Sequence, residues 1–186
     1  MTGKPRASPV VGLANHLVQF FPLSCFLFVA FRQGRPQPED WLIAFMVGGA
    51  IAVLQVALTL AITRGRPLNR MLLGVNTYLA IGGLSALTNQ LPVLYALNDL
   101  RESGLFLCIL AVGVLTTLGS KAGFVGQEDS PGRSRTKRYS LALLALAIIA
   151  TIPSFFIRGQ LILSAVIPLT LLSIVNRWFA NRIQRS

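Results

Sequence analysis

Four side chains that can donate and accept hydrogen bonds lie inside long apolar stretches of the chain: His16, Gln19, Gln55 and Asn76. At a rise of about 1.5 Å per residue, the three amides fall about 8 to 12 Å from the same side of a predicted membrane bundle, with His16 slightly nearer to that side. This layer predicts either a polar pocket for a head group or small solute, or hydrogen bonds between helices. His16 is the only histidine, and one imidazole without a carboxylate partner makes a poor proton relay.

The rest of the chain carries no arrangement of residues typical of an enzyme or a metal site. Cys25 and Cys108 are isolated in apolar stretches, with no CxxC pair and no His/Cys cluster. The patterns HExxH, GxSxG and a phosphate-binding glycine loop are absent. No Asp, Glu, Lys or Arg lies in the centre of an apolar stretch, which argues against an ion-coupled transporter. We therefore expect a non-enzymatic protein with no metal and no cofactor.

The composition is that of an integral membrane protein. Of 186 residues, 53% are hydrophobic and only 12% are charged, whereas soluble domains average roughly 25% charged residues. Several apolar runs approach the roughly 20 residues that cross a bilayer as a helix. The net charge of +11 lies in short clusters between these runs. Nucleic-acid binding requires a basic face interleaved with aromatic residues, so the lipid bilayer is the expected partner and nucleic acid is not.

We predict one membrane domain over residues 1–186, an all-α bundle of six transmembrane helices. The predicted spans are Val11–Phe31, Trp41–Thr63, Met71–Leu87, Leu100–Ser120, Tyr139–Ile157 and Gln160–Arg177. Helices are required because lipid satisfies no backbone polar group. A basic loop over residues 121–138 follows the fourth span, and its part from Gly126 to Arg138 has the composition of a disordered segment.

Lysine and arginine residues gather on one side of the predicted bundle. That side holds all 17 of them except four. The exceptions are Arg32, Arg35, Arg101 and Arg158. Because positive residues accumulate in cytoplasmic loops, both termini are predicted to lie in the cytoplasm.

Small residues predict where helices approach one another. Ala44, Gly48 and Ala52 recur every four residues, and Gly119 and Gly123 form a Gly-x-x-x-Gly pair. Such surfaces allow close contact between helix backbones. Close packing within the bundle is the preferred interpretation, and dimerisation is the alternative.

The connection between the third and fourth predicted spans has two parts. Leu91–Asn98 is either a helix lying on the membrane surface or a loop. Asp99 and Glu102 then resemble a capping box, with Asp in the place usually taken by Ser or Thr. We interpret both acids as the start of the fourth span.

Two segments carry a family resemblance. FFPLSCFLFVAFRQG (Phe20–Gly34) gives an aromatic-Pro-Leu start to a phenylalanine-rich span, and IGGLSALTNQ (Ile81–Gln90) is a Gly-Gly span leaving into a short polar connection. With the later order of a span, a polar loop and a closing hairpin, the chain resembles the bacterial intracellular septation protein A family, also called YciB. The resemblance implies a plasma-membrane protein that supports cell-envelope synthesis or septation through protein partners.

Two functions from different classes follow. The first is a non-enzymatic inner-membrane protein that acts through helix-mediated contacts with envelope or division proteins. The second is a small carrier or channel for an uncharged or lipid-like solute, using the layer of Gln19, Gln55 and Asn76. A cavity opening onto that layer would favour the second function, and amides locked to one another would count against it.

Overall fold

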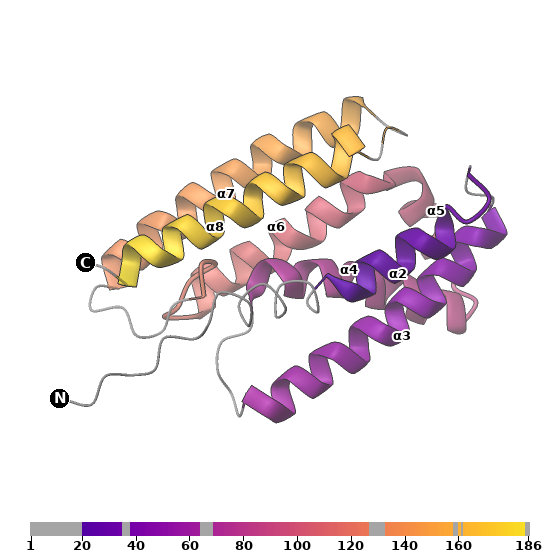
Figure 1. The fold of residues 1–186 in the computed structure, drawn as a ribbon, viewed down its shortest axis with the longest axis horizontal. Coiled ribbons are helices and arrows are strands. Elements are labelled where there is room, and N and C mark those ends of the chain that lie inside the picture. Colours follow the sequence, from indigo (N-terminus) through magenta and orange to yellow (C-terminus); the bar gives the residue numbers. More distant parts are fainter. Residues whose placement is uncertain are drawn as a thin grey trace.

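The structure is a computed structural model that describes residues 20–34, 38–63, 69–126, 133–157, 160 and 162–184. In this part of the chain every regular element is a helix (Figure 1). In chain order they are α2 (Phe21–Ala30), α3 (Pro38–Thr63), α4 (Arg70–Leu87), α5 (Leu91–Leu100), α6 (Glu102–Gly119), α7 (Arg133–Phe156), the π-helical turn η1 (Ile162–Val166) and α8 (Ile167–Gln184). The prediction of an all-α fold is confirmed.

Four segments of these helices are long and apolar enough to cross a membrane: Glu39–Ala61, Glu102–Gly119, Ser134–Phe156 and Ile162–Ile183. They correspond to the second, fourth, fifth and sixth predicted spans. This composition is compatible with a multi-pass membrane protein. The third predicted span coincides with α4, and the second half of the first contains α2, a shorter apolar helix of 10 residues.

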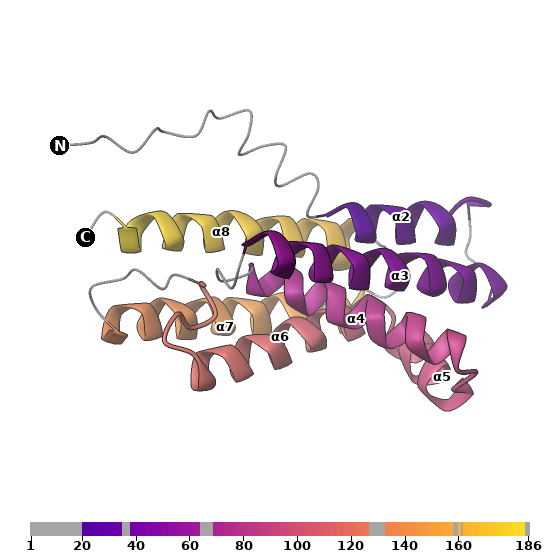
Figure 2. The same cartoon turned by 90° about the horizontal axis from the view of Figure 1, so that it is seen from below.

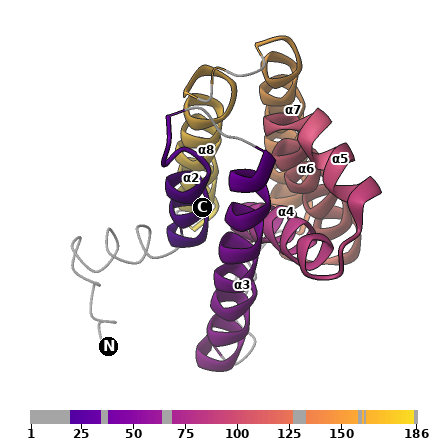
Figure 3. The same cartoon turned by 90° about the vertical axis from the view of Figure 1, so that its right-hand side faces the viewer.

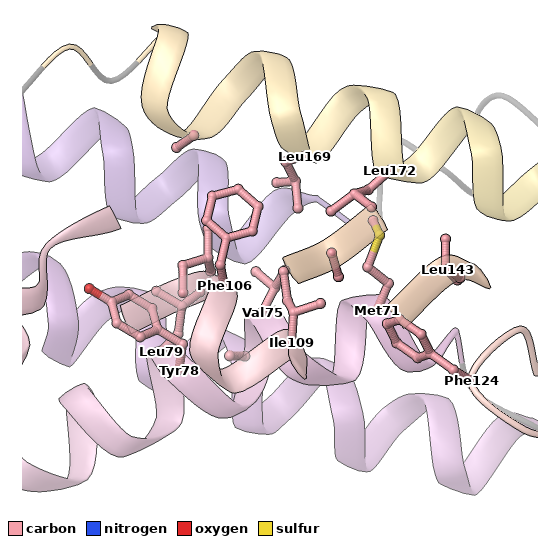
Figure 4. Close-up of a cluster of buried hydrophobic side chains, with 14 of the residues drawn as sticks. Met71, Val75, Tyr78, Leu79, Phe106, Ile109, Phe124, Leu143, Leu169 and Leu172 are labelled. Atoms are coloured by element: carbon pink, nitrogen blue, oxygen red, sulfur yellow. The ribbon is translucent and has the colours of Figure 1, made fainter. Parts of the chain in front are cut away.

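Helix α4 is the centre of the bundle. It lies between α3 and α6 and also contacts α2 and α5 (Figure 3). Apolar side chains from α4, α6, α7, α8 and the turn after α6 meet in one core (Figure 4). Its central members are Met71, Val75, Tyr78, Leu79, Phe106, Ile109, Phe124, Leu143, Leu169 and Leu172. Because α4 is packed on several faces, even its polar Asn76 is buried.

The helices alternate in direction and give the bundle two ends (Figure 2). We call one the α5 end, where α3 and α6 begin, and the other the Arg70 end, where α4 and α7 begin. In the described part of the chain, every Asp and Glu lies at the α5 end. At that end Arg32 donates from Nε to Oδ1 of Asp40 at 3.0 Å and so joins the end of α2 to the start of α3.

The start of α6 differs from the predicted capping box. Asp99 lies within α5, and the residue preceding α6 is Arg101, which has a positive φ of 47° and makes no side-chain cap. Residues 91–100 form a helix rather than a loop, with Tyr95 exposed and Leu97 buried. Because α5 continues through Asp99, that carboxylate is not available as the first cap of α6.

The described parts of the basic loop, residues 121–126 and 133–138, have regular structure. Helix α7 already begins at Arg133, inside the segment expected to be disordered. The turn directly after α6 is packed into the bundle, with Ala122, Phe124 and Val125 buried. Apolar burial of these three residues outweighs the polar composition around them.

Candidate functional site

Two amides of the predicted polar layer lie side by side across the α3–α4 interface. The Nδ2 group of Asn76 donates a hydrogen bond of 3.0 Å to Oε1 of Gln55. Asn76 is buried and Gln55 is half-buried. Hydrogen bonds of this kind between membrane helices contribute about 0.6 kcal/mol on average. This hydrogen bond therefore joins α3 to α4 in addition to their apolar packing.

The other members of the layer, His16 and Gln19, lie outside the described residues. Within the described part, Oδ1 of Asn76 is buried without a hydrogen-bond partner. Three cavities at the two ends of the bundle, described below, are lined by other residues. The described amides therefore form an interhelical pair, and neither of them lines any of these three cavities.

The small-residue stripe on α3 lies in the interior of the bundle. Ala44 and Ala52 are fully buried. A Cβ atom at Gly48 would lie 2.9 Å from Cβ of Phe26 in α2 and 3.5 Å from a methyl group of Leu79 in α4. This stripe is where α2 and α4 approach α3.

Two close helix crossings use glycines that the sequence interpretation missed. A Cβ atom at Gly49 would lie 2.7 Å from the carbonyl oxygen of Leu79 and 2.8 Å from Cα of Gly83. On its other side α4 places Gly74 against α6, where a Cβ atom would lie 2.6 Å from Cα of Ile109. In the sequence these glycines stand out as Gly-Gly steps at residues 48–49 and 82–83, of which only Gly48 belongs to the predicted packing stripe.

Gly119 and Gly123 do not lie on one helix, and of the two only Gly123 packs closely against a neighbour. Helix α6 ends at Gly119, and a Cβ atom there would have no neighbour within 4 Å. Gly123 lies beyond the helix, in the turn, with a positive φ of 56°. It does make a close contact, because a Cβ atom would lie 2.3 Å from Oγ of Ser140 in α7. A spacing of four residues places two side chains on one face only within a helix, and α6 ends at Gly119.

A small cavity lies inside the α5 end, between α2, α3, α4, α6, η1 and α8. Its volume is about 40 Å³, and its lining includes Phe26, Trp41, Tyr78 and Glu102. The Tyr78 hydroxyl donates to the carbonyl oxygen of Arg101 at 3.2 Å. Glu102 is 8% exposed, and its Oε2 has no hydrogen-bond partner among the described residues. By size this space would hold a few waters, but its accessible lining is almost entirely apolar and offers them few polar partners.

A larger groove lies on the outside of the α5 end, between α3 and α5. Its volume is about 310 Å³. Apolar walls come from residues such as Phe45, Leu91 and Leu94, and polar groups come from Glu39 and Asn98. An amphipathic groove beside an apolar helix suits a lipid-like molecule.

In the described ranges, no three His, Cys, Asp or Glu side chains gather closely enough to hold a metal ion. No protein-family model, curated protein or solved structure matches this chain.

Proposed function

We propose that this chain is a non-enzymatic membrane protein that supports cell-envelope synthesis or septation through contacts between its helices and other membrane proteins. The hydrogen bond from Asn76 to Gln55 is the observation that carries this proposal. The two amides bind each other and hold α3 against α4, so they serve packing rather than passage of a solute. The resemblance of Phe20–Gly34 and Ile81–Gln90 to the septation protein A family supplies the cellular process.

The proposed topology is six spans in the bacterial plasma membrane, with both ends of the chain in the cytoplasm. The distribution of charge supports it. The Arg70 end carries Arg70, Lys121, Arg135, Lys137, Arg138 and Arg182, whereas the α5 end carries all described acids. Positive residues accumulate on the cytoplasmic side, so the Arg70 end is assigned to the cytoplasm.

The second half of α3 is the surface we assign to partner contacts. Here the helix exposes large apolar side chains, with Val53, Leu54, Leu58 and Leu60 each at least half exposed. In the most apolar stretch of α3, 28% of the residues are buried in the bundle, against 33% for α7 and for η1 with α8, and 50% for α6. Exposed apolar helix faces within a membrane are covered by lipid or by another helix.

Site-specific photo-crosslinking in cells tests this assignment. A photoreactive residue at Leu58 is expected to capture a defined envelope-synthesis or division protein, and its removal is expected to alter envelope or septum formation. The matched control is the same residue at Ile149 of α7, which is 60% exposed. Capture of lipid alone from Leu58, or the same proteins from both positions, would contradict the proposal.

The α3–α5 groove favours a second candidate function, a carrier for an uncharged or lipid-like solute. Leu94 lines this groove, and a Leu94→Trp variant would fill it. A carrier is expected to lose flux in proteoliposomes when the groove is filled, while Leu84→Trp on the exposed face of α4 leaves flux unchanged. Equal flux in both variants and in empty liposomes would exclude this function.

A further inference from the structure

A polar pocket lies at the Arg70 end, beside the junction of α6 and α7. It has a volume of about 490 Å³, and its lining includes Thr117, Leu118, Ser120, Lys121, Ser134 and Lys137. The end of α6 and the start of α7 both lie at this end of the bundle (Figure 2). Gly123, in the turn after α6, also lines the pocket. From its chemistry we propose that this pocket binds the phosphate head group of an anionic phospholipid.

The positive charge of the pocket comes from two elements. Lys121 follows the end of α6, and Lys137 lies in the second turn of α7. Both ammonium groups belong to exposed residues, and the described lining contains no Asp or Glu. Two cations that line one cavity, with no carboxylate among its described lining residues, favour an anion between them.

A third cation acts on the pocket through a serine. Arg70 is buried, and its Nη2 donates to Oγ of Ser120 at 2.8 Å. The backbone N–H of Ala122 donates to the same oxygen at 3.2 Å. With its oxygen accepting two hydrogen bonds, the Ser120 hydroxyl retains its own hydrogen for a ligand. Arg70 also donates to the carbonyl oxygen of Gly123, which holds the turn in place.

The start of α7 adds to the attraction for an anion. Ser134 lies in the first turn of this helix of 24 residues. Backbone N–H groups in a first turn have no partner within the helix and carry partial positive charge. Phosphate groups bind at helix N-termini for this reason, and here the effect adds to two lysines and two serine hydroxyls.

The apolar wall identifies the source of the phosphate as a lipid. Leu118 lines the pocket and is 75% exposed, and Leu115, one turn earlier on α6, is 70% exposed. Both residues belong to a helix that is apolar enough to cross a membrane. When the head group of a phospholipid lies between the two lysines, its acyl chain can therefore lie along α6. A soluble phosphate compound would gain nothing from these leucines.

Native mass spectrometry of the full chain from detergent tests the proposal with phosphatidylglycerol as the anionic lipid and phosphatidylcholine as the zwitterionic one. Phosphatidylglycerol is expected to remain bound preferentially. A contribution of about 1 kcal/mol per basic residue corresponds to about a fivefold loss of affinity for each of Lys121→Gln and Lys137→Gln. The double variant is therefore expected to bind roughly 25-fold more weakly.

The matched control removes the same charge from the same end without touching the pocket. Arg135→Gln with Arg177→Gln serves this purpose, because both residues are exposed and neither lines the cavity. Lys121→Arg with Lys137→Arg restores the charge and is expected to retain preferential binding. Helix content measured by circular dichroism checks that each variant is folded.

Three outcomes would overturn the proposal. Equal retention of both lipids by the unmodified protein would show that the pocket does not select an anionic head group. Equal loss of binding in the control variant would assign the effect to the general charge of this end. Displacement of the lipid by millimolar glycerol phosphate or inorganic phosphate would identify a site for soluble anions. None of these outcomes bears on partner contacts made by α3.

Discussion

Gly49 of α3 and Gly83 of α4 face each other backbone to backbone, so that a Cβ atom at Gly83 would lie 2.9 Å from Cα of Gly49. Side chains at these positions would separate the two helices. The separation would also disturb the nearby ring of Phe45, which packs directly over Gly82. This crossing holds the α3–α4 interface together.

Enlarging this crossing is expected to destabilise the bundle. Gly83→Leu inserts several methylene-sized groups where none fit, at a cost of about 1–3 kcal/mol from overpacking. Gly119→Ala is the control, because a Cβ atom at that position meets nothing within 4 Å. It is expected to leave stability unchanged or raise it by about 0.5 kcal/mol. The midpoint of thermal unfolding in detergent measures the stability of both variants. Equal midpoints would contradict the role of the Gly49–Gly83 crossing in holding α3 against α4.

The amide pair is expected to show a small, specific coupling. A double-mutant cycle with Gln55→Ala and Asn76→Ala isolates their interaction, which is expected at about 0.6 kcal/mol and below roughly 1.7 kcal/mol. Thr170→Ala on the exposed side of α8 is the control partner for Asn76→Ala. Its coupling is expected to vanish within about 0.5 kcal/mol. A coupling of zero between Gln55 and Asn76 in reversible unfolding would mean that their hydrogen bond does not stabilise the bundle.

Arg70 is expected to hold the turn after α6 against the bundle. Arg70→Gln removes a buried cation that donates to Gly123 and Ser120, and hydrogen bonds from charged groups contribute about 1.5–3 kcal/mol. The freed turn should be cut faster by trypsin after Lys121. The fragment ending there, followed by mass spectrometry, is the measurement.

The control for this prediction is Arg135→Gln, which removes one exposed charge near the start of α7. Its cleavage after Lys121 is expected to proceed at the unmodified rate. If Arg70→Gln is cut no faster than this control, the turn is held by burial of Phe124 and its neighbours alone.

The Arg70 end, which carries most of the described basic residues, is expected to lie on the cytoplasmic side of the membrane. In a background with Cys25→Ser and Cys108→Ser, single cysteines replace Tyr95 at the α5 end and Ser134 at the Arg70 end. Both positions are exposed. A membrane-impermeant maleimide added to intact spheroplasts is expected to label the cysteine at position 95 only. Labelling at position 134 instead would reverse the topology, and labelling at both would contradict a spanning bundle.

The apolar runs predicted most of the helices. Expected bounds and observed bounds agree closely for α3, α4 and α6, because a backbone in an apolar environment must satisfy its own hydrogen bonds. The depth estimate also placed Gln55 and Asn76 at one level, since a helix rises by a constant amount per residue. These are consequences of chain geometry, and sequence alone is enough to derive them.

Where the helices stop was harder to predict, and two site interpretations failed there. Gly119 and Gly123 have helical spacing, but α6 ends between them. Asp99 and Glu102 have capping-box spacing, but α5 extends through Asp99. Phe124, beyond the end of α6, is buried against the bundle, and Arg101 carries the positive φ that separates α5 from α6.

Sequence by itself determined that this chain is a bundle of apolar helices with its charges sorted to the two ends, because hydropathy and charge act through each residue's own solvation. Only the tertiary structure decided which glycines meet, that Asn76 bonds to Gln55, and that Lys121 and Lys137 line one pocket. Those contacts depend on the rotation and crossing of whole helices. They arise from the fit between surfaces far apart in the chain, which no local pattern encodes.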